Sequence, residues 1–324
     1  MSVESQVLSF DSKGRLVYNH SQSRRGEEEN LSKFHYGGQA VIEGVMIRGQ
    51  KNMAVAVRDP GGTIVVHTEP LTAGIYTSPI GKWPLVRGLT MLWDTLVLGI
   101  RTLMFSADIA LGEEEVEFSG PIAWGTIAIS LIAAVTIFFL GPLFLVGFID
   151  RFIASSLLSN IIEGLIRLAL FLAYVFAIGF IPDIKRVFAY HGAEHKTINA
   201  YEDGASLEPA VVGTYTTAHS RCGTAFLLMV VFLAVLVFAF LGRPPLLLRV
   251  LSRLLLIPVI AALAYEFIKF SAAHRNSPLI NLILKPGLAL QRLTTREPDE
   301  TMLEVAITAL EKVLAADEAT ETTG

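Results

Sequence analysis

The chain has 324 residues, of which 52% are hydrophobic and only 17% are charged, and its mean hydropathy is +0.53. Soluble domains carry about 25% charged residues, so this composition argues against an ordinary soluble protein and favours a membrane protein with the lipid bilayer as partner. The net charge of −4, without a basic patch, argues against nucleic acid as a partner. The single cysteine, Cys222, excludes an intrachain disulfide.

The first part of the chain is predicted to lie outside the membrane. Residues 1–33 are polar, contain no apolar run suited to a signal peptide, and predict a disordered tail. Residues 34–75 combine β-prone runs with the turn sequence Asp59-Pro60-Gly61-Gly62, which predicts a small β-rich domain. Glu43 lies in an apolar run of this domain, so it is either a solvent-facing strand residue or a carboxylate delivered to a site.

Residues 83–112 predict a long helix that is apolar on nearly every side. Charges of alternating sign recur along it at every seventh position, namely Arg87, Asp94, Arg101 and Asp108. This spacing places the charged side chains in one stripe along the helix. A narrow charged stripe fits an amphipathic helix in the membrane interface, and it fits equally a helix buried against its neighbours.

Residues 121–270 predict a membrane domain of about four transmembrane helices, since a crossing takes about 20 apolar residues. The apolar segments cover residues 121–149, 157–181, 223–241 and 248–268. With four crossings, both termini and the connection between the second and third segments share one side. That side carries 21 Lys and Arg residues against four near the opposite connections, so the positive-inside rule makes it cytoplasmic. We therefore expect a multi-pass protein of the inner cell membrane with cytoplasmic N- and C-termini.

Residues 271–315 are predicted to form a cytoplasmic segment after the last crossing. Pro286-Gly287 indicates a loop, and Asp299 and Glu300 indicate the start of a final helix, because carboxylates stabilise helix N-termini. Residues 316–324 are expected to form a loose tail. The predicted fold class is therefore a mainly α, polytopic membrane protein with a small N-terminal β-meander on the cytoplasmic side.

The strongest chemical signal lies in the cytoplasmic segment 183–222, in the run YHGAEHKTINAYE. This run contains an H-x-x-E-H pattern made by His191, Glu194 and His195. If the run is helical, these side chains share one face, because helix neighbours are three and four residues apart. In proteins with this pattern the two histidines bind a divalent metal and the glutamate acts as general base.

A metal site needs a third or fourth ligand, and several candidates are expected at the same membrane face. His219 and Cys222 lie just before the third apolar segment. Glu202 lies on the same helix face as the motif, and Glu266 lies near the end of the fourth segment. Simpler interpretations stay open: the motif can be a helix-surface pair, Cys222 a buried thiol, and Glu266 an ion-pair partner of Lys269.

Six runs of the sequence resemble the YqhQ-type family of bacterial membrane proteins. They are YGGQAVIEGVMIRG (36–49), PLVRG (84–88), YHGAEHKTINAYE (190–202), HSRCGT (219–224), YEFIKF (265–270) and PGLALQRLTTREPD (286–299). This is a domain-of-unknown-function family described as predicted metal-dependent enzymes, so the resemblance implies a metal-dependent enzyme and brings no reaction with it. It marks as site residues His191, Glu194, His195, His219 and Cys222, with Glu43 and Arg221 in support. Ser220 departs from the family's pattern, in which Pro is expected there.

Two functions from different classes fit these observations. The first is a membrane enzyme that uses a divalent metal, expected to be zinc, to activate a water for hydrolysis at the cytoplasmic membrane face. The expected ligands are His191, His195 and His219. Cys222 is a fourth ligand or a near neighbour, and Glu194 takes the proton of the water.

The second function is a non-enzymatic scaffold or assembly factor, in which the same cluster is structural and the charged helix stripe favours a homo-oligomer. A transporter fits less well, because no predicted crossing holds paired charges in its interior. The substrate stays open under either function.

Overall fold

The computed structural model describes residues 8–10, 16–18, 36–71, 83–112, 121–219, 222–274 and 277–322. Residues 1–36 form a unit by themselves, in which β1 (Leu8–Phe10) and β2 (Leu16–Tyr18) pair antiparallel. This short sheet departs from the disordered tail predicted for residues 1–33, and the rest of that tail lies outside the described residues. The end of the predicted β-rich domain, residues 72–75, also lies outside them.

Residues 37–324 form the second unit, which begins with the predicted β-meander. Four strands pair antiparallel in the order β3-β4-β5-β6. They are β3 (Gly37–Val41), β4 (Gly44–Arg48), β5 (Asn52–Arg58) and β6 (Ile64–Pro70). Strand β5 is buried from Asn52 to Val57, although an antiparallel sheet often leaves one face in water. Other parts of the chain therefore cover both faces of this sheet.

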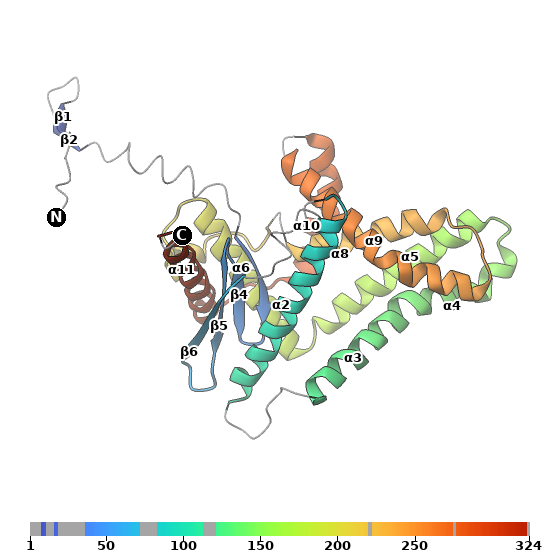
Figure 1. Cartoon of the computed structure of the whole chain (residues 1–324), viewed down its shortest axis with the longest axis horizontal. Coiled ribbons are helices and arrows are strands. Elements are labelled where there is room, and N and C mark those ends of the chain that lie inside the picture. Colours follow the sequence, from blue (N-terminus) through green and yellow to red (C-terminus); the bar gives the residue numbers. More distant parts are fainter. Residues whose placement is uncertain are drawn as a thin grey trace. The chain divides into compact units, whose positions relative to one another are not determined.

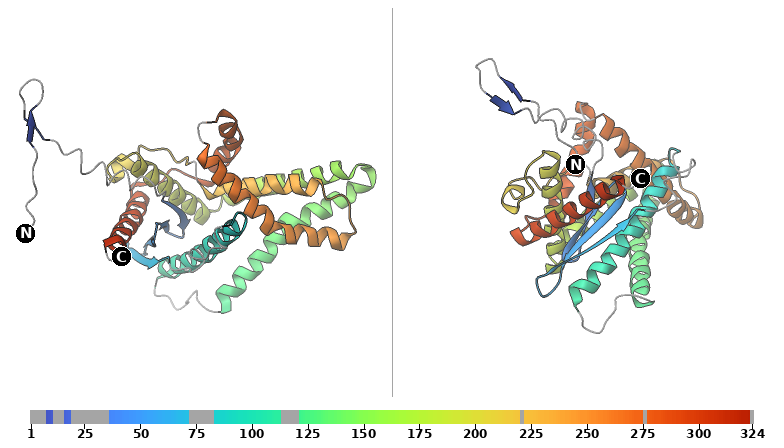
Figure 2. Two further views of the ribbon diagram at one scale, coloured as in Figure 1. Left: turned by 45° about the horizontal axis from the view of Figure 1, so that its top comes forward. Right: turned by 60° about the vertical axis from the view of Figure 1, so that its left-hand side comes forward.

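Three helices cover the sheet, with α2 on one face and α6 and α11 on the other (Figures 1 and 2). They are α2 (Val86–Leu111), α6 (Pro182–Glu202) and α11 (Glu300–Thr322). The core between α2 and the sheet includes Leu98 of the helix and Val55 and Val57 of β5. Because α6 carries the H-x-x-E-H motif, this arrangement places the motif directly against the sheet.

The charged stripe of α2 fastens this helix to two neighbouring elements. Arg87 forms a bidentate ion pair with Glu266 of α9 (Leu246–Ala273). Further along, Asp94 accepts a hydrogen bond from Arg48 of β4 at 2.5 Å. At these two positions the stripe binds elements of one chain together, which leaves fewer of its charged residues to contact a second copy of the chain.

Helix α11 corrects the prediction of a loose C-terminal tail, because it continues to Thr322. The physical reason is Asp317, which is buried and accepts the backbone N–H groups of Gln50, Lys51 and Asn52 at 2.7–3.0 Å. Gln50 and Lys51 lie in the turn between β4 and β5, and Asn52 is the first residue of β5. The last turns of the helix are therefore ordered by the sheet rather than by their own sequence.

Three helical segments are long and apolar enough to cross a membrane, namely Trp124–Phe152, Ser156–Ile178 and Leu246–Ser271. They comprise α3 (Pro121–Val135), the π-helical turn η2 (Thr136–Leu140), α4 (Gly141–Ile149), the 3-10 turn η3 (Asp150–Phe152), α5 (Ser156–Ile178) and most of α9. The remaining predicted crossing corresponds to α8 (Gly223–Ala239), an apolar helix of only 17 residues. The structure thus supports a membrane protein, and the count of four crossings stays a prediction.

The outer surface of these helices is apolar. Side chains exposed by 65–82% on them or beside their ends are Ile129, Leu131, Ile132, Phe148, Phe152, Phe240, Leu247 and Leu255. Soluble proteins rarely expose apolar surface on this scale, so the helices are suited to contact with lipid.

The structure corrects the expectation that no crossing holds paired charges in its interior. Glu163 and Arg167 of α5 are 1% and 2% exposed and form an ion pair at 2.8 Å. Arg253 of α9 is fully buried and also donates to Glu163, at 3.0 Å. The sequence shows these residues only as interruptions of apolar runs, and it does not reveal the contact of Glu163 with Arg253, because these two residues are 90 positions apart on different helices.

Helix α10 (Pro278–Thr294) corrects the prediction of a loop around Pro286-Gly287. Proline and glycine usually interrupt a helix. Here Gly287 lies so close to α8 that a methyl group on it would be 3.0 Å from the Ala225 side chain. Close packing between two helices therefore outweighs the local sequence signal, and it brings the end of α10 to the candidate site.

Candidate functional site

Helix α6 carries a polar sequence that is nevertheless buried. It begins with Pro182 and Asp183, which both favour a helix N-terminus. Further along, Glu194, His195 and Lys196 are at most 3% exposed. Buried polar groups are stable only when they are hydrogen-bonded. This face of α6 must therefore make specific polar contacts with the elements packed on it.

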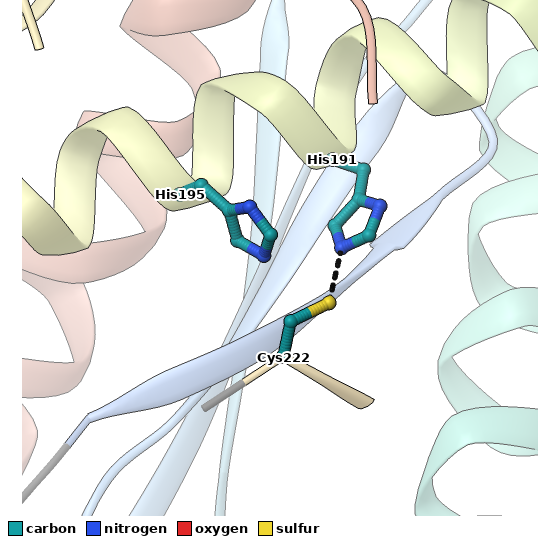
Figure 3. A group of neighbouring side chains, drawn as sticks. All are labelled: His191, His195 and Cys222. Atoms are coloured by element: carbon teal, nitrogen blue, oxygen red, sulfur yellow. Dashed lines mark hydrogen bonds between the residues drawn. The ribbon is translucent and has the colours of Figure 1, made fainter. Parts of the chain in front are cut away.

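Three of the predicted site residues meet beneath α6, and we call them the His-His-Cys group: His191, His195 and Cys222 (Figure 3). One ligand atom from each lies within 4.8 Å of the others. Both imidazoles point from α6 toward the Cys222 thiol, and Nε2 of His191 is 3.2 Å from Sγ. Cys222 is also the N-cap of α8, so the group joins α6 to the start of an apolar helix.

The other ring nitrogen of each histidine faces a backbone carbonyl. Nδ1 of His191 is 2.8 Å from the carbonyl oxygen of Thr294, and Nδ1 of His195 is 2.6 Å from that of Thr217. A carbonyl oxygen only accepts hydrogen bonds, so in the neutral imidazole Nδ1 carries the proton and Nε2 carries a lone pair. Metal-binding histidines in proteins are oriented in this way. In His191 that lone pair is directed toward Cys222.

Glu194 lies beside the His-His-Cys group and is held by the sheet. Its Oε1 accepts the backbone N–H of Gly38 at 2.9 Å, and its Oε2 lies 3.5 Å from Nε2 of His195. A methyl group on Gly38 would be 2.3 Å from the carbonyl oxygen of Met46 and 3.2 Å from Cγ of Glu194. Glycine at this position therefore lets β3 approach α6 closely enough to anchor one carboxylate oxygen and leave the other facing the imidazole.

The imidazole of His219 lies next to that of His195, outside the His-His-Cys group. Its ring centroid is 5.5 Å from that of His195, and its Nε2 is 3.9 Å from the carboxylate of Glu202. Gln291 of α10 fixes its backbone, accepting from the N–H at 2.9 Å and donating to the carbonyl at 2.7 Å. Two predicted residues, His219 and Glu202, are therefore neighbours of the group without belonging to it.

Glu43 has a different partner. It lies in the turn between β3 and β4 with a φ of 50°, which is uncommon for a residue with a side chain. Its carboxylate accepts two hydrogen bonds from Arg186 of α6 at 2.5 Å, and the Tyr190 hydroxyl is 3.4 Å away. The hydrogen bonds to Glu43 raise the pKa of Arg186, and burial and the Glu43 charge raise the pKa of Tyr190. This carboxylate fastens the sheet to α6.

The last two supporting candidates do not add to the site that the structure describes. Glu266 binds Arg87 of α2, so its carboxylate belongs to the contact between α2 and α9. Among the described residues, the ion pair of Glu266 is formed with Arg87 and not with Lys269, the partner considered from the sequence. Arg221 lies outside the described residues, as does Ser220.

Three residues that hold the site are not found by sequence reasoning. Thr217 and Thr294 act through backbone carbonyl groups, which any residue could supply, so no sequence signal marks them. Gln291 is different, because its side chain is 1% exposed and lies in the signature run PGLALQRLTTREPD. A polar side chain in the middle of that run was the available signal.

Comparison with known proteins agrees with the resemblance seen in the sequence. Residues 83–316 match the family described as "Protein of unknown function (DUF1385)". The chain is 33% identical over 299 residues to the "Uncharacterized protein YqhQ" of Bacillus subtilis (strain 168), covering 88% of this chain and 94% of that relative. No solved structure matches significantly. Because both matches extend over most of its length, the chain belongs to the DUF1385 family, whose function is unknown.

Proposed function

We propose that the chain binds a divalent metal at His191, His195 and Cys222 and works as a metal-dependent, hydrolase-like membrane enzyme. The observation that carries this proposal is the convergence of two imidazoles and a thiol, with each Nδ1 already facing a carbonyl group. Imidazole and thiolate are ligands that suit zinc, and catalytic zinc sites use three protein ligands with a fourth position open to water. Zinc is therefore the proposed ion.

Glu194 would act as the general base of such a site. A bound zinc ion would supply a Lewis acid that lowers the pKa of a coordinated water to about 7. The N–H of Gly38 holds Oε1 of Glu194, so Oε2, which faces His195, is the oxygen suited to accept a proton. His219 lies next to His195 and is suited to act as a further ligand or to orient a substrate.

The proposal places the site at the cytoplasmic face of the inner membrane. We take α8 as the fourth crossing, because its 17 residues rise about 25 Å, close to the roughly 30 Å of a hydrocarbon core. Helix α2 would lie in the membrane interface. Its outward face exposes Trp93 by 63% and Leu96 by 54%, and Trp83, exposed by 63%, lies just before the helix. Tryptophan is enriched at that depth.

Elemental analysis of detergent-purified protein tests the metal site. We expect about one zinc per chain in the wild type, as in a mononuclear zinc site, and loss of zinc in His191→Ala and His195→Ala. The control is His274→Ala, because His274 is exposed at the end of α9. A well-folded wild type that holds no metal, even after reconstitution with zinc, would overturn the proposal.

Glu194→Gln separates the enzyme from a scaffold. The scaffold is a real alternative, because the same residues tie α6 to β3 through Gly38 and to the end of α10 through Thr294. For an enzyme we expect Glu194→Gln to keep zinc and to lose function by about 10²–10⁴-fold, the usual contribution of a general base. The measurement is growth or phenotype of cells that carry only the variant, with zinc content measured in parallel. Retained zinc with an intact phenotype would favour the scaffold.

A further inference from the structure

A second polar cluster lies inside the apolar helices and takes no part in the His-His-Cys site. We call it the arginine cluster, and its members are Arg167, Arg243, Arg249, Arg253, Asp150 and Glu163. Glu163 is its centre, since its two oxygens accept hydrogen bonds from Arg167 at 2.8 Å and from Arg249 and Arg253 at 3.0 Å. Asp150 lies at its edge.

The cluster is far from the candidate site along α8. The guanidinium groups of Arg167 and Arg253 lie over the ring of Phe238, at 5.1 and 4.4 Å from its centroid. Phe238 is near the end of α8, whereas Cys222 caps its start. The helix between them has 17 residues and spans about 25 Å, so the two sites lie at opposite ends of α8.

The arginines of this cluster outnumber its carboxylates. Four guanidinium groups face two carboxylates, and a guanidinium keeps its charge in proteins. Three of the arginines are almost fully buried, with exposures of 2% for Arg167, 7% for Arg249 and 0% for Arg253. Uncompensated charge in a membrane interior is costly, and such residues usually have a functional reason.

The hydrogen bonds of the cluster show the same deficit of acceptors. Within the cluster, as far as the structure describes it, three buried donor atoms have no acceptor: Nη1 of Arg167, Nε of Arg249 and Nη1 of Arg253. Asn160 already accepts from Arg253, and the Phe138 carbonyl from Arg167. Ordered water could accept these donors but would not balance the charge. An anion with several oxygen atoms would do both.

We propose that the arginine cluster binds a phosphate-bearing anion. Arginine is suited to phosphate because its planar group donates two parallel hydrogen bonds to one anion. The route of entry is the edge at Asp150 and Arg243, whose side chains are 20% and 28% exposed. Arg249 connects this edge to the interior, since it binds both Asp150 and Glu163. The anion is the headgroup of an acidic phospholipid or a free phosphate.

Thermal unfolding of the full-length protein in detergent tests the proposal and distinguishes the two possible sources of the anion, a lipid headgroup and a free phosphate. The protein is stripped of lipid and phosphate, and either inorganic phosphate or phosphatidylglycerol micelles are added. The references are chloride at the same ionic strength and phosphatidylcholine micelles. We expect at least one addition to raise the melting temperature. A shift with phosphatidylglycerol alone identifies a lipid headgroup, and a shift with inorganic phosphate identifies a free anion.

A pair of variants ties the effect to the cluster. Arg243→Gln removes a charge at the exposed edge. It should weaken the binding of the stabilising phosphate or lipid about tenfold, the loss expected for one charge-assisted hydrogen bond. Arg151→Gln removes an exposed charge that stacks on Phe152 and should match the wild type. Absence of any shift in the wild type, or an equal loss in both variants, would overturn the proposal.

Discussion

Glycine at position 192 has a packing role inside the H-G-A-E-H run. A methyl group there would lie 2.1 Å from the carbonyl oxygen of Arg296 and 3.3 Å from the Thr217 side chain. The backbone that follows α10 therefore runs directly along α6. This close approach puts the carbonyl of Thr294 against Nδ1 of His191. One residue without a side chain thus allows the contact that orients a proposed ligand.

Replacing this glycine should damage both stability and the site. We expect Gly192→Ala to cost about 1–3 kcal/mol of unfolding free energy, the usual cost of overpacking, and to lower zinc content because the Thr294 carbonyl moves. Thermal unfolding and elemental analysis in detergent measure the two effects. Gly147→Ala is the control, since no atom lies within 4 Å of a methyl group at Gly147, and it should be neutral or slightly stabilising. Equal stability and zinc content in the two variants would contradict this account.

Sequence reasoning finds the side chains of the candidate site better than its backbone contacts. The spacing of the H-x-x-E-H run and the positions of the apolar segments predict that Cys222 lies near His191, as the structure shows. They do not reveal the carbonyl groups of Thr217 and Thr294, because every residue carries one. The anchoring of Glu194 by Gly38 joins residues 156 positions apart, and only the fold brings them together.

Elements at the C-terminal end show where local sequence signals fail. Pro286-Gly287 indicates a loop, yet α10 continues through it because Gly287 packs against Ala225. The final residues indicate a loose tail, yet α11 continues because Asp317 binds the turn between β4 and β5. In both cases a contact with a distant element decides the structure, and composition within a short window cannot show such a contact.

The end of α11 should depend on Asp317. We expect Asp317→Ala to cost about 3 kcal/mol, because it deprives the N–H groups of Gln50, Lys51 and Asn52 of a charged acceptor. Glu318→Ala is the matched control on the same helix, and it should change stability by less than about 0.5 kcal/mol because Glu318 is exposed. Denaturant unfolding in detergent measures both. If the two variants are equally stable, the carboxylate does not fasten the helix.

At the scale of the whole molecule, composition and apolar runs predict the class of protein well. The mainly helical fold, the small antiparallel sheet and three membrane-length helices all follow from hydropathy and turn signals. Charges inside the membrane domain are harder to interpret, because Glu163 and Arg253 are ninety residues apart in sequence and paired in space. The number of crossings depends on α8, whose 17 residues are at the short end for a span.

The four-crossing topology makes a prediction that does not depend on the metal. If α8 crosses the membrane, its two ends lie on opposite sides, with the His-His-Cys group in the cytoplasm. One cysteine introduced at either of the exposed positions Ser206 and Pro245 reports one of the two sides. A membrane-impermeant maleimide should label Pro245→Cys in intact cells and Ser206→Cys only after permeabilisation. The wild type gives the background from Cys222, which is buried. Labelling of both positions from the same side would mean that α8 does not cross, and the cytoplasmic placement of the site would then lose its basis in the positive-inside rule.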